Sequence, residues 1–424
     1  MRTITLFILS FCGLCLNGQN TFHDNIIRDD RIKTVSLYRE DWNLSYPIMN
    51  LSSGEKLVLN FDLLDDNPEN YYYSFIFCDK DWKESGAFVN DYLEGYEENP
   101  VEDYKVSFNT TVQYYHYSVS FPNDRVSLKL SGNYILMVYS PGNKEKPVLE
   151  QRFMITENAV KIDIDAHRPQ MTKDNNTHQQ IDFNINHSGL PINDPYRDVF
   201  ATVLQNGRWE TAKVNLKPDF NGNNELKYSS LSDKNIFPGG NEFRYFDIKS
   251  IRYLSEFVRN IEFRTPYYNV YLQPSENREF KPYFYWKDFN GKYYIAVQEG
   301  RNPDTDGDYV YVYFTLPAKQ PLADGNMYVS GALNNWKLDK NNLMTYNSSA
   351  RQYECTMLLK QGWYNYEFEF LRNGEKSGII GPFESNHYET ENDYVVLVYY
   401  RNPRERYDRL IGSAIQNTLN RIKD

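Results

Sequence analysis

The sequence predicts an all-β protein built from tandem β-sandwich domains with a short helix at the C-terminus. Aromatic residues make up 16% of the 424 residues, with 37 Tyr and 25 Phe, and aromatic side chains favour strands. In most patterned segments, apolar residues alternate with a period of two, which is typical of half-buried strands. Turn clusters rich in Asp, Asn, Gly and Pro separate these segments without intervening helical patterns, so sandwiches are favoured over a parallel α/β sheet.

The alternating segments set the expected domains. Strands are expected at 57–61, 71–77, 115–121, 134–139, 181–185 and 309–314, with turns at 65–68, 140–143 and 220–224. We expect a first sandwich at 19–157, a second at 158–300 and a third at 301–402. The tail at 403–424 is expected to be an amphipathic helix, because apolar residues recur there at helical spacing: Tyr407, Leu410, Ile411, Ala414, Ile415, Leu419 and Ile422. It would dock on the protein itself or on a partner.

The N-terminus is typical of a secretory signal peptide at 1–18, with Arg2 followed by an apolar stretch at 4–16 and cleavage near Gln19. An uncleaved anchor is the alternative interpretation. The apolar stretch is shorter than the roughly 20 residues that span a bilayer. Only Cys78 and Cys355 follow this segment, and their apolar surroundings indicate small buried side chains rather than a disulfide framework. These features favour export to the periplasm.

The charge balance excludes two classes of partner. Asp and Glu number 57 against 46 Lys and Arg, for a net charge of −11. An acidic chain lacks the basic surface that nucleic-acid binding requires. The same excess of negative charge disfavours attachment to an anionic membrane.

No catalytic motif is present in the sequence. The six His form no H-E-x-x-H pair, and no P-loop, nucleophile elbow or dinucleotide fingerprint follows a strand. We therefore predict no enzymatic activity, no cofactor and no catalytic residue.

One loop resembles half of a calcium site. Asn302, Asp304, Asp306 and Gly307 match the first positions of an EF-hand loop, but Tyr313 stands where the bidentate Glu is required. A tight polar turn is favoured over calcium binding, and no metal site is predicted.

The segment 327–400 resembles the starch- and glycogen-binding module of the early-set, immunoglobulin-like class. The matching strings lie at 329–336, 361–368 and 390–398. In that family the Trp at the position of Trp336 stacks on a sugar ring, but Glu367 here replaces the family's Lys and Lys376 its second Trp. The resemblance implies the early-set sandwich fold, and leaves Trp336 open to core packing, sugar stacking or partner contact. A periplasmic glycan-binding protein is the alternative function.

A second resemblance covers nearly the whole exported chain. Strings that resemble the plug protein of the Bacteroidota type IX secretion system lie, in order, at 71–82, 91–96, 107–110, 114–117, 121–123, 131–134, 205–209, 239–247, 288–293, 401–403 and 407–412. The resemblance implies a non-enzymatic periplasmic protein bound to an outer-membrane β-barrel translocon of the SprA type. It would seal the periplasmic mouth of the barrel when no cargo is engaged, without entering the membrane itself. Carbohydrate binding is not expected.

Turn residues of the first domain are the expected partner contacts, because loops on a rigid sandwich commonly carry binding. We expect Asp79, Asp81, Trp82 and Asn109 to face the translocon. The alternatives are turn capping for Asp79 and Asp81, and core packing for Trp82.

Overall fold

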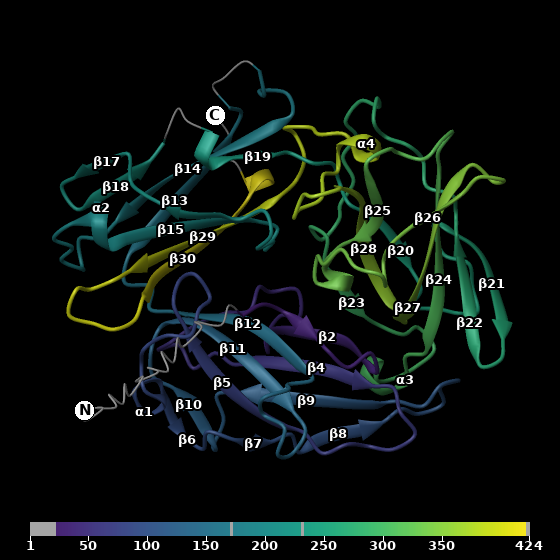
Figure 1. Ribbon diagram of the computed structural model, residues 1–424, viewed down its shortest axis with the longest axis horizontal. Coiled ribbons are helices and arrows are strands. Elements are labelled where there is room, and N and C mark those ends of the chain that lie inside the picture. Colours follow the sequence, from purple (N-terminus) through teal and green to yellow (C-terminus); the bar gives the residue numbers. More distant parts are fainter. Residues whose placement is uncertain (1–22, 170–172, 230–232, 421–424) are drawn as a thin grey trace, which may run out of the picture.

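The computed structural model describes residues 23–169, 173–229 and 233–420 (Figure 1). The expected signal peptide at 1–18 lies outside the described residues. Strands dominate the described part, where each α-helix has four residues. None of the helices in the described part of the chain has the length and apolar character of a membrane span. The prediction of an all-β chain of sandwich domains is confirmed.

The first domain is a sandwich of two main sheets around an aromatic core. One sheet has the order β1-β12-β11-β5-β7, with β3 parallel to β12, and the other has the order β2-β4-β9-β8. A small pair, β6–β10, flanks them. The elements are β1 (Ile26–Ile27), β2 (Ile32–Arg39), β3 (Ile48–Asn50), β4 (Leu57–Leu63), β5 (Tyr72–Cys78), α1 (Val89–Tyr92), β6 (Leu93–Gly95), β7 (Asn99–Pro100), β8 (Asp103–Val106), β9 (Tyr115–Phe121), β10 (Val126–Leu128), β11 (Gly132–Tyr139) and β12 (Leu149–Thr156).

The second domain is formed by two separate parts of the chain. Its sheets have the orders β13-β14-β18-β17, with β19 beside β14, and β16-β15-β29-β30. The first part contains β13 (Lys161–His167), β14 (His178–Asn186), α2 (Pro195–Asp198), β15 (Val199–Gln205), β16 (Lys213–Leu216), β17 (Phe220–Gly222), β18 (Glu225–Tyr228), η1 (Asp233–Asn235) and β19 (Ile236–Pro238). The second part contains β29 (Asp393–Tyr400), β30 (Arg409–Asn417) and η3 (Thr418–Asn420).

The third domain lies between these two parts in the sequence. Its sheets have the orders β20-β28-β23, with β25 beside β28, and β21-β22-β24-β27-β26. Its elements are β20 (Arg244–Asp247), β21 (Val258–Arg264), β22 (Tyr267–Leu272), β23 (Tyr293–Ile295), α3 (Pro303–Asp306), β24 (Tyr309–Pro317), β25 (Gly325–Ser330), η2 (Ala332–Asn334), β26 (Thr345–Asn347), β27 (Gln352–Lys360), β28 (Gly362–Arg372) and α4 (Gly381–Glu384).

This pairing divides the chain differently from the expected boundaries at 300 and 402. Strands β20 to β23 precede residue 300 but pair within the third domain, and β29 pairs with β15 of the second domain. Figure 1 shows the yellow C-terminal strands returning to lie beside the teal strands of the second domain. Hairpin spacing does not reveal an insertion of this kind, because the interrupted domain resumes with strands of the same pattern.

The expected C-terminal helix is wrong for the described residues, because Arg409–Asn417 is strand β30, paired with β29. Leu410 packs between the first and second domains, whereas its neighbour Ile411 packs in the core of the second domain. Both faces of the strand are therefore buried here. Apolar residues on both faces of a strand produce a spacing that periodicity alone does not distinguish from a buried helix.

The first and second domains share a buried apolar interface. On the first domain it includes Ile135 and Met137 of β11, and on the second Leu397 and Tyr399 of β29. The hydroxyl of Tyr399 donates a hydrogen bond to Asn133 Oδ1 of β11 at 2.8 Å. The sheet that contains β29 and β30 thus buries one face in its own domain and the other against the first domain.

Leu410→Ala should lower the free energy of unfolding by about 2–5 kcal/mol, because Leu410 is fully buried between two domains. Ile415→Ala on the same strand is the matched control, since Ile415 is 51% exposed, and should change stability by less than about 1 kcal/mol. Urea unfolding of both variants measures the difference. Equal losses would contradict the burial of Leu410 at this interface.

Candidate functional site

A buried ionic contact centred on Asp62 joins the first domain to the third. Lys360 Nζ lies 2.7 Å from Asp62 Oδ2, and both side chains are 1% exposed. The hydroxyl of Tyr309 donates to the same oxygen at 2.7 Å, and His116 Nδ1 lies 2.7 Å from Oδ1. Burial alone would raise the pKa of Asp62, but Lys360 and His116 outweigh it and hold that pKa below its ordinary value. The Asp62 carboxylate is therefore ionised, and both of its oxygens accept hydrogen bonds, as a buried charge requires.

The contact continues along the loop that contains α3. Tyr114 of the first domain donates to the carbonyl oxygens of Gly307 at 2.9 Å and Asp304 at 3.1 Å. The backbone N–H and the hydroxyl of Thr111 both donate to Asp308 Oδ1, at 2.6 and 2.8 Å. This loop of the third domain is therefore held by direct hydrogen bonds to the first.

This loop is the one whose sequence resembles half of a calcium site. Asn302 Oδ1 accepts from the N–H of Asp304 at 3.1 Å, and Asp306 Oδ2 accepts from the N–H of Arg301 at 2.8 Å. These side chains cap a tight turn. Among the residues that the structure describes, no group of three or more His, Cys, Asp and Glu is placed to hold a metal ion.

Trp82 lies inside the molecule, between the first and second domains. Its side chain is 3% exposed and packs edge-on against Trp209 of the second domain, with ring centroids 4.9 Å apart. The Arg152 guanidinium lies 4.5 Å from the Trp82 ring centroid. In this conformation, Trp82 contacts the second domain rather than the outer surface.

Asp79 and Asp81 lie in the turn that precedes Trp82. Asp79 Oδ1 accepts from the backbone N–H of Asp81 at 2.9 Å and of Lys83 at 3.0 Å, which caps the turn. Asp81 Oδ1 accepts from Asn215 Nδ2 of the second domain at 2.9 Å. The structure thus brings these two residues and Trp82 together at the interface of two domains.

Asn109 is exposed, at the end of an exposed edge of the first domain. It has a φ of 59° and follows Phe108, whose N–H donates to Thr305 O of the third domain at 2.9 Å. The side chains of Tyr104, Val106 and Phe108 are 45%, 50% and 73% exposed. Strand β8 pairs with β9 on one side and ends the sheet on the other. We refer to Tyr104, Val106, Phe108 and Asn109 as the β8 edge.

Trp336 lies at the contact between the second and third domains. The guanidinium of Arg208, from the second domain, lies 4.5 Å from the Trp336 ring centroid, and Phe243 lies 5.7 Å away, edge to face. Arg208 also forms ion pairs with Glu367 and Glu369 of β28, each at 2.7 Å. The arginine therefore occupies a ring face that sugar stacking would use, and Glu367 accepts a hydrogen bond from this arginine.

Glu242 joins the two segments that connect the second and third domains. It is fully buried, and its Oε1 accepts from the hydroxyl of Tyr283 and from the N–H of Glu391 at 3.0 Å. Its Oε2 has no hydrogen-bond partner among the described residues. Burial raises the pKa of Glu242 to about 7, and the neighbouring charge of Glu391 adds to the effect.

Sequence reasoning missed the buried charges at these contacts. Asp62, Lys360, Glu367 and Glu369 all lie in strands. A signal was available, because a charged side chain within an otherwise apolar strand must find a partner or remain exposed. The identity of that partner depends on how the domains meet, which the pattern of one strand does not show.

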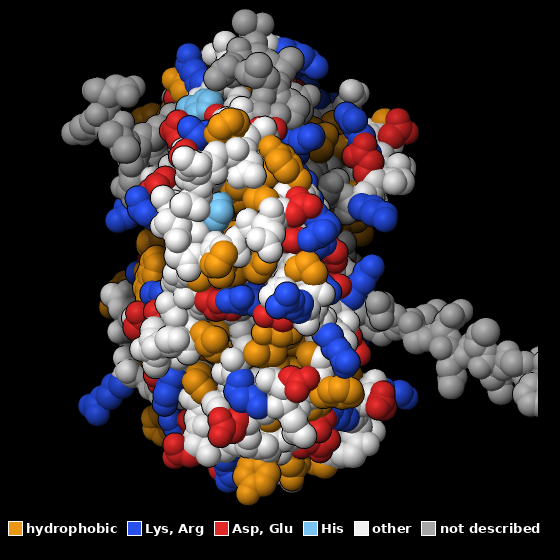
Figure 2. All heavy atoms as spheres, turned by 90° about the vertical axis from the view of Figure 1, so that its left-hand side faces the viewer, with side chains coloured by type: hydrophobic (Ala, Val, Ile, Leu, Met, Phe, Trp, Pro, Cys, Tyr) orange, Lys and Arg blue, Asp and Glu red, His pale blue; other side chains and the backbone are white. Residues whose placement is uncertain are grey.

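One face of the molecule carries side chains of mixed character. Figure 2 shows one face on which acidic, basic and apolar side chains lie interspersed. Such a surface suits wet protein contacts more than binding to a polyanion.

Comparison with known proteins gives two findings. Residues 32–157 match the family described as type 9 secretion system plug protein, first domain. A crystal structure of a hypothetical protein from Parabacteroides merdae is 36% identical, with a TM-score of 0.90, over 94% of this chain and 100% of that one. Residues 32–157 therefore belong to the family of first domains of type 9 secretion system plug proteins. The match supports a role in type 9 secretion. The search of curated proteins returned no match.

Lys360→Ala should lower the free energy of unfolding by about 3–5 kcal/mol, because it leaves the buried Asp62 charge without its main counter-ion. Lys340→Ala is the control. Lys340 pairs with Asp30 across the same two domains at 3.6 Å, but its side chain is 75% exposed, so the loss should stay below about 1 kcal/mol. Chemical denaturation measures both values, and similar losses would argue against a buried ionic contact.

The protein should lose stability as pH rises through about 7, owing to Glu242. Because the pKa of Glu242 is raised, the folded state binds the proton more tightly than the unfolded state does. The resulting contribution to the free energy of unfolding is complete below about pH 4.5 and is lost above about pH 7. Glu242→Gln should remove about 3 kcal/mol of the difference in unfolding free energy between pH 5 and 8. Glu375→Gln, at an exposed position of the third domain, should follow the wild type. If the free energy of unfolding of Glu242→Gln varied with pH as that of the wild type does, the prediction would be wrong.

Proposed function

We propose that this protein is a periplasmic plug that binds and seals the inner mouth of an SprA-type outer-membrane β-barrel when no cargo is engaged. The plug-family domain at 32–157 carries the proposal. The 36% identity over nearly the whole chain with a protein of matching fold supports extending the family assignment beyond that domain.

The interdomain contacts supply the rigidity that a stopper needs. The first domain contacts the second through an apolar interface and the third through the Asp62–Lys360 pair. The second and third domains meet through Arg208. Contacts of this kind oppose hinge motion. Opening them would expose apolar surface to water and would separate paired charges that water solvates only in part. The role requires no catalytic group.

The β8 edge is the proposed contact with the barrel. It combines exposed apolar side chains with the free backbone groups of an edge strand, and both features favour protein contact. It also contains Asn109, the residue among the sequence-derived candidates that the structure leaves exposed. Asp79, Asp81 and Trp82 are proposed to act indirectly, by fixing the first domain on the second.

A pull-down with a C-terminal tag tests the proposal. Wild-type protein should co-purify the translocon barrel from solubilised outer membranes. A Tyr104→Ser/Phe108→Asp variant should reduce the yield at least tenfold, because it replaces exposed contact side chains without opening the core. Phe220→Asp, at a 55% exposed position on the second domain, is the control and should retain the barrel. Failure of the wild type to capture the barrel would overturn the function, whereas normal capture by the double variant would overturn only the surface.

A further inference from the structure

A groove on the third domain shares no lining residue with the β8 edge, and Asn241 at its margin belongs to a segment that connects the second and third domains. Its volume is about 580 Å³, which is within the range of small-ligand sites. Its walls include the aromatic residues Tyr245, Phe257, Phe284, Trp286 and Tyr366. Phe284 is 71% exposed and Phe257 is 40% exposed. Ligand sites commonly combine such apolar walls with a few converging polar groups.

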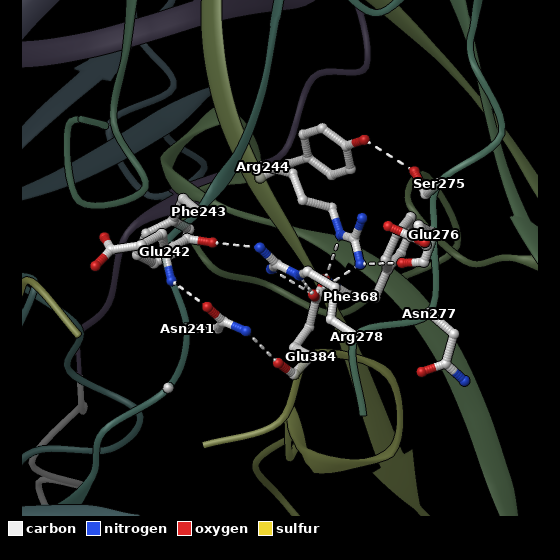
Figure 3. Close-up of polar contacts among 12 residues, drawn as sticks. Asn241, Glu242, Phe243, Arg244, Ser275, Glu276, Asn277, Arg278, Phe368 and Glu384 are labelled. Carbon is white, nitrogen blue, oxygen red and sulfur yellow. Dashed lines mark hydrogen bonds and ion pairs between the residues drawn. The ribbon is translucent and has the colours of Figure 1, made fainter. Parts of the chain in front are cut away.

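Two arginines converge on one carboxylate at the base of the groove (Figure 3). Arg244 donates to both oxygens of Glu384, at 2.8 and 2.9 Å, and Arg278 Nε donates to Glu384 Oε2 at 2.7 Å. The Glu384 side chain is 1% exposed, and the arginine side chains are 10% and 9% exposed. Arginine does not lose its proton in proteins, so this buried cluster carries one more positive than negative charge.

The donors of the two arginines are not all used. Arg278 Nη1 donates to the carbonyl of Glu242 at 2.9 Å, and Arg244 Nη2 also donates to the carbonyl of Glu276 at 2.6 Å. Arg244 Nη1 donates to no acceptor in the described part of the chain, and Figure 3 shows this nitrogen directed away from Glu384. A nine-tenths buried guanidinium with a free N–H pair is a strong donor for an incoming anion.

The carboxylates on the rim do not cancel this charge. Glu276 forms an ion pair with Lys281, and Glu256 accepts a hydrogen bond from the hydroxyl of Tyr245 at 2.7 Å. Both glutamates are exposed, so water screens them more effectively than it screens the buried arginines. Burial lowers the pKa of Arg278, and the neighbouring Arg244 charge adds to that effect, as expected for a cluster with surplus positive charge.

We propose that this groove binds the C-terminal carboxylate of a peptide that ends in an aromatic residue. The carboxylate would accept from Arg244 Nη1, and the terminal side chain would pack against Phe284 and Phe257. A terminal residue fits this arrangement because its carboxylate and side chain leave the same Cα. An internal peptide bond offers no full negative charge to the arginine pair. The groove is a peptide site whether or not the protein plugs a barrel.

A pair of labelled peptides tests this site on the purified protein. Gly-Ser-Gly-Phe with a free carboxylate should show saturable binding by fluorescence anisotropy. The same peptide with a C-terminal amide should bind at least tenfold more weakly, because it lacks the charge that the arginines recognise. Equal binding of the two peptides, or no saturable binding of the free acid, would overturn the proposal.

Variants of exposed residues separate the groove from the rest of the surface. Phe284→Ser should weaken binding of the free-acid peptide at least tenfold. It should leave the unfolding transition unchanged, since the side chain is largely exposed. Phe263→Ser, on β21 of the same domain and 53% exposed, is the matched control and should bind as the wild type does. Equal affinity of the two variants would place the peptide elsewhere and overturn the assignment to this groove.

Discussion

The buried pair of Asp62 and Lys360 is the contact on which the arrangement of the first and third domains depends. Each charge is almost fully removed from water, so neither is tolerated without the other. Tyr309 and His116 occupy further hydrogen-bonding positions on the carboxylate, which makes the geometry specific. A pair of this kind defines one relative position of two domains, because a small displacement would leave a charge buried and unsatisfied.

The path of the chain reinforces this arrangement. The third domain is inserted between β19 and β29 of the second, so two segments cross between these domains, and Glu242 links the two crossings. The returning strands β29 and β30 then pack on the first domain. Buried tyrosines contribute at both junctions, with apolar rings and hydroxyls that reach across to a neighbouring domain. The abundance of tyrosine in the chain thus acquires a structural explanation.

Sequence patterns predicted the strands and the class of fold, because alternation reflects local side-chain burial. They did not predict the tail, since Leu410 and Ile411 are buried on opposite faces of one strand and imitate helical spacing. The first domain alone suggests that Trp82 is exposed. Trp209 of the second domain, more than 100 positions along the chain, packs against it. Asn109 could be predicted as an exposed turn residue, but the apolar strand edge beside it became evident only once β8 was placed at the end of its sheet.

Outer-membrane permeability reports directly on whether this protein seals the barrel. A strain that lacks this protein, with the barrel still produced, should admit a large hydrophilic antibiotic that the parent strain excludes. Expression of the wild-type chain should restore exclusion. Unchanged uptake in the deletion strain, with the barrel verified in the outer membrane, would contradict the proposal that this protein seals the translocon.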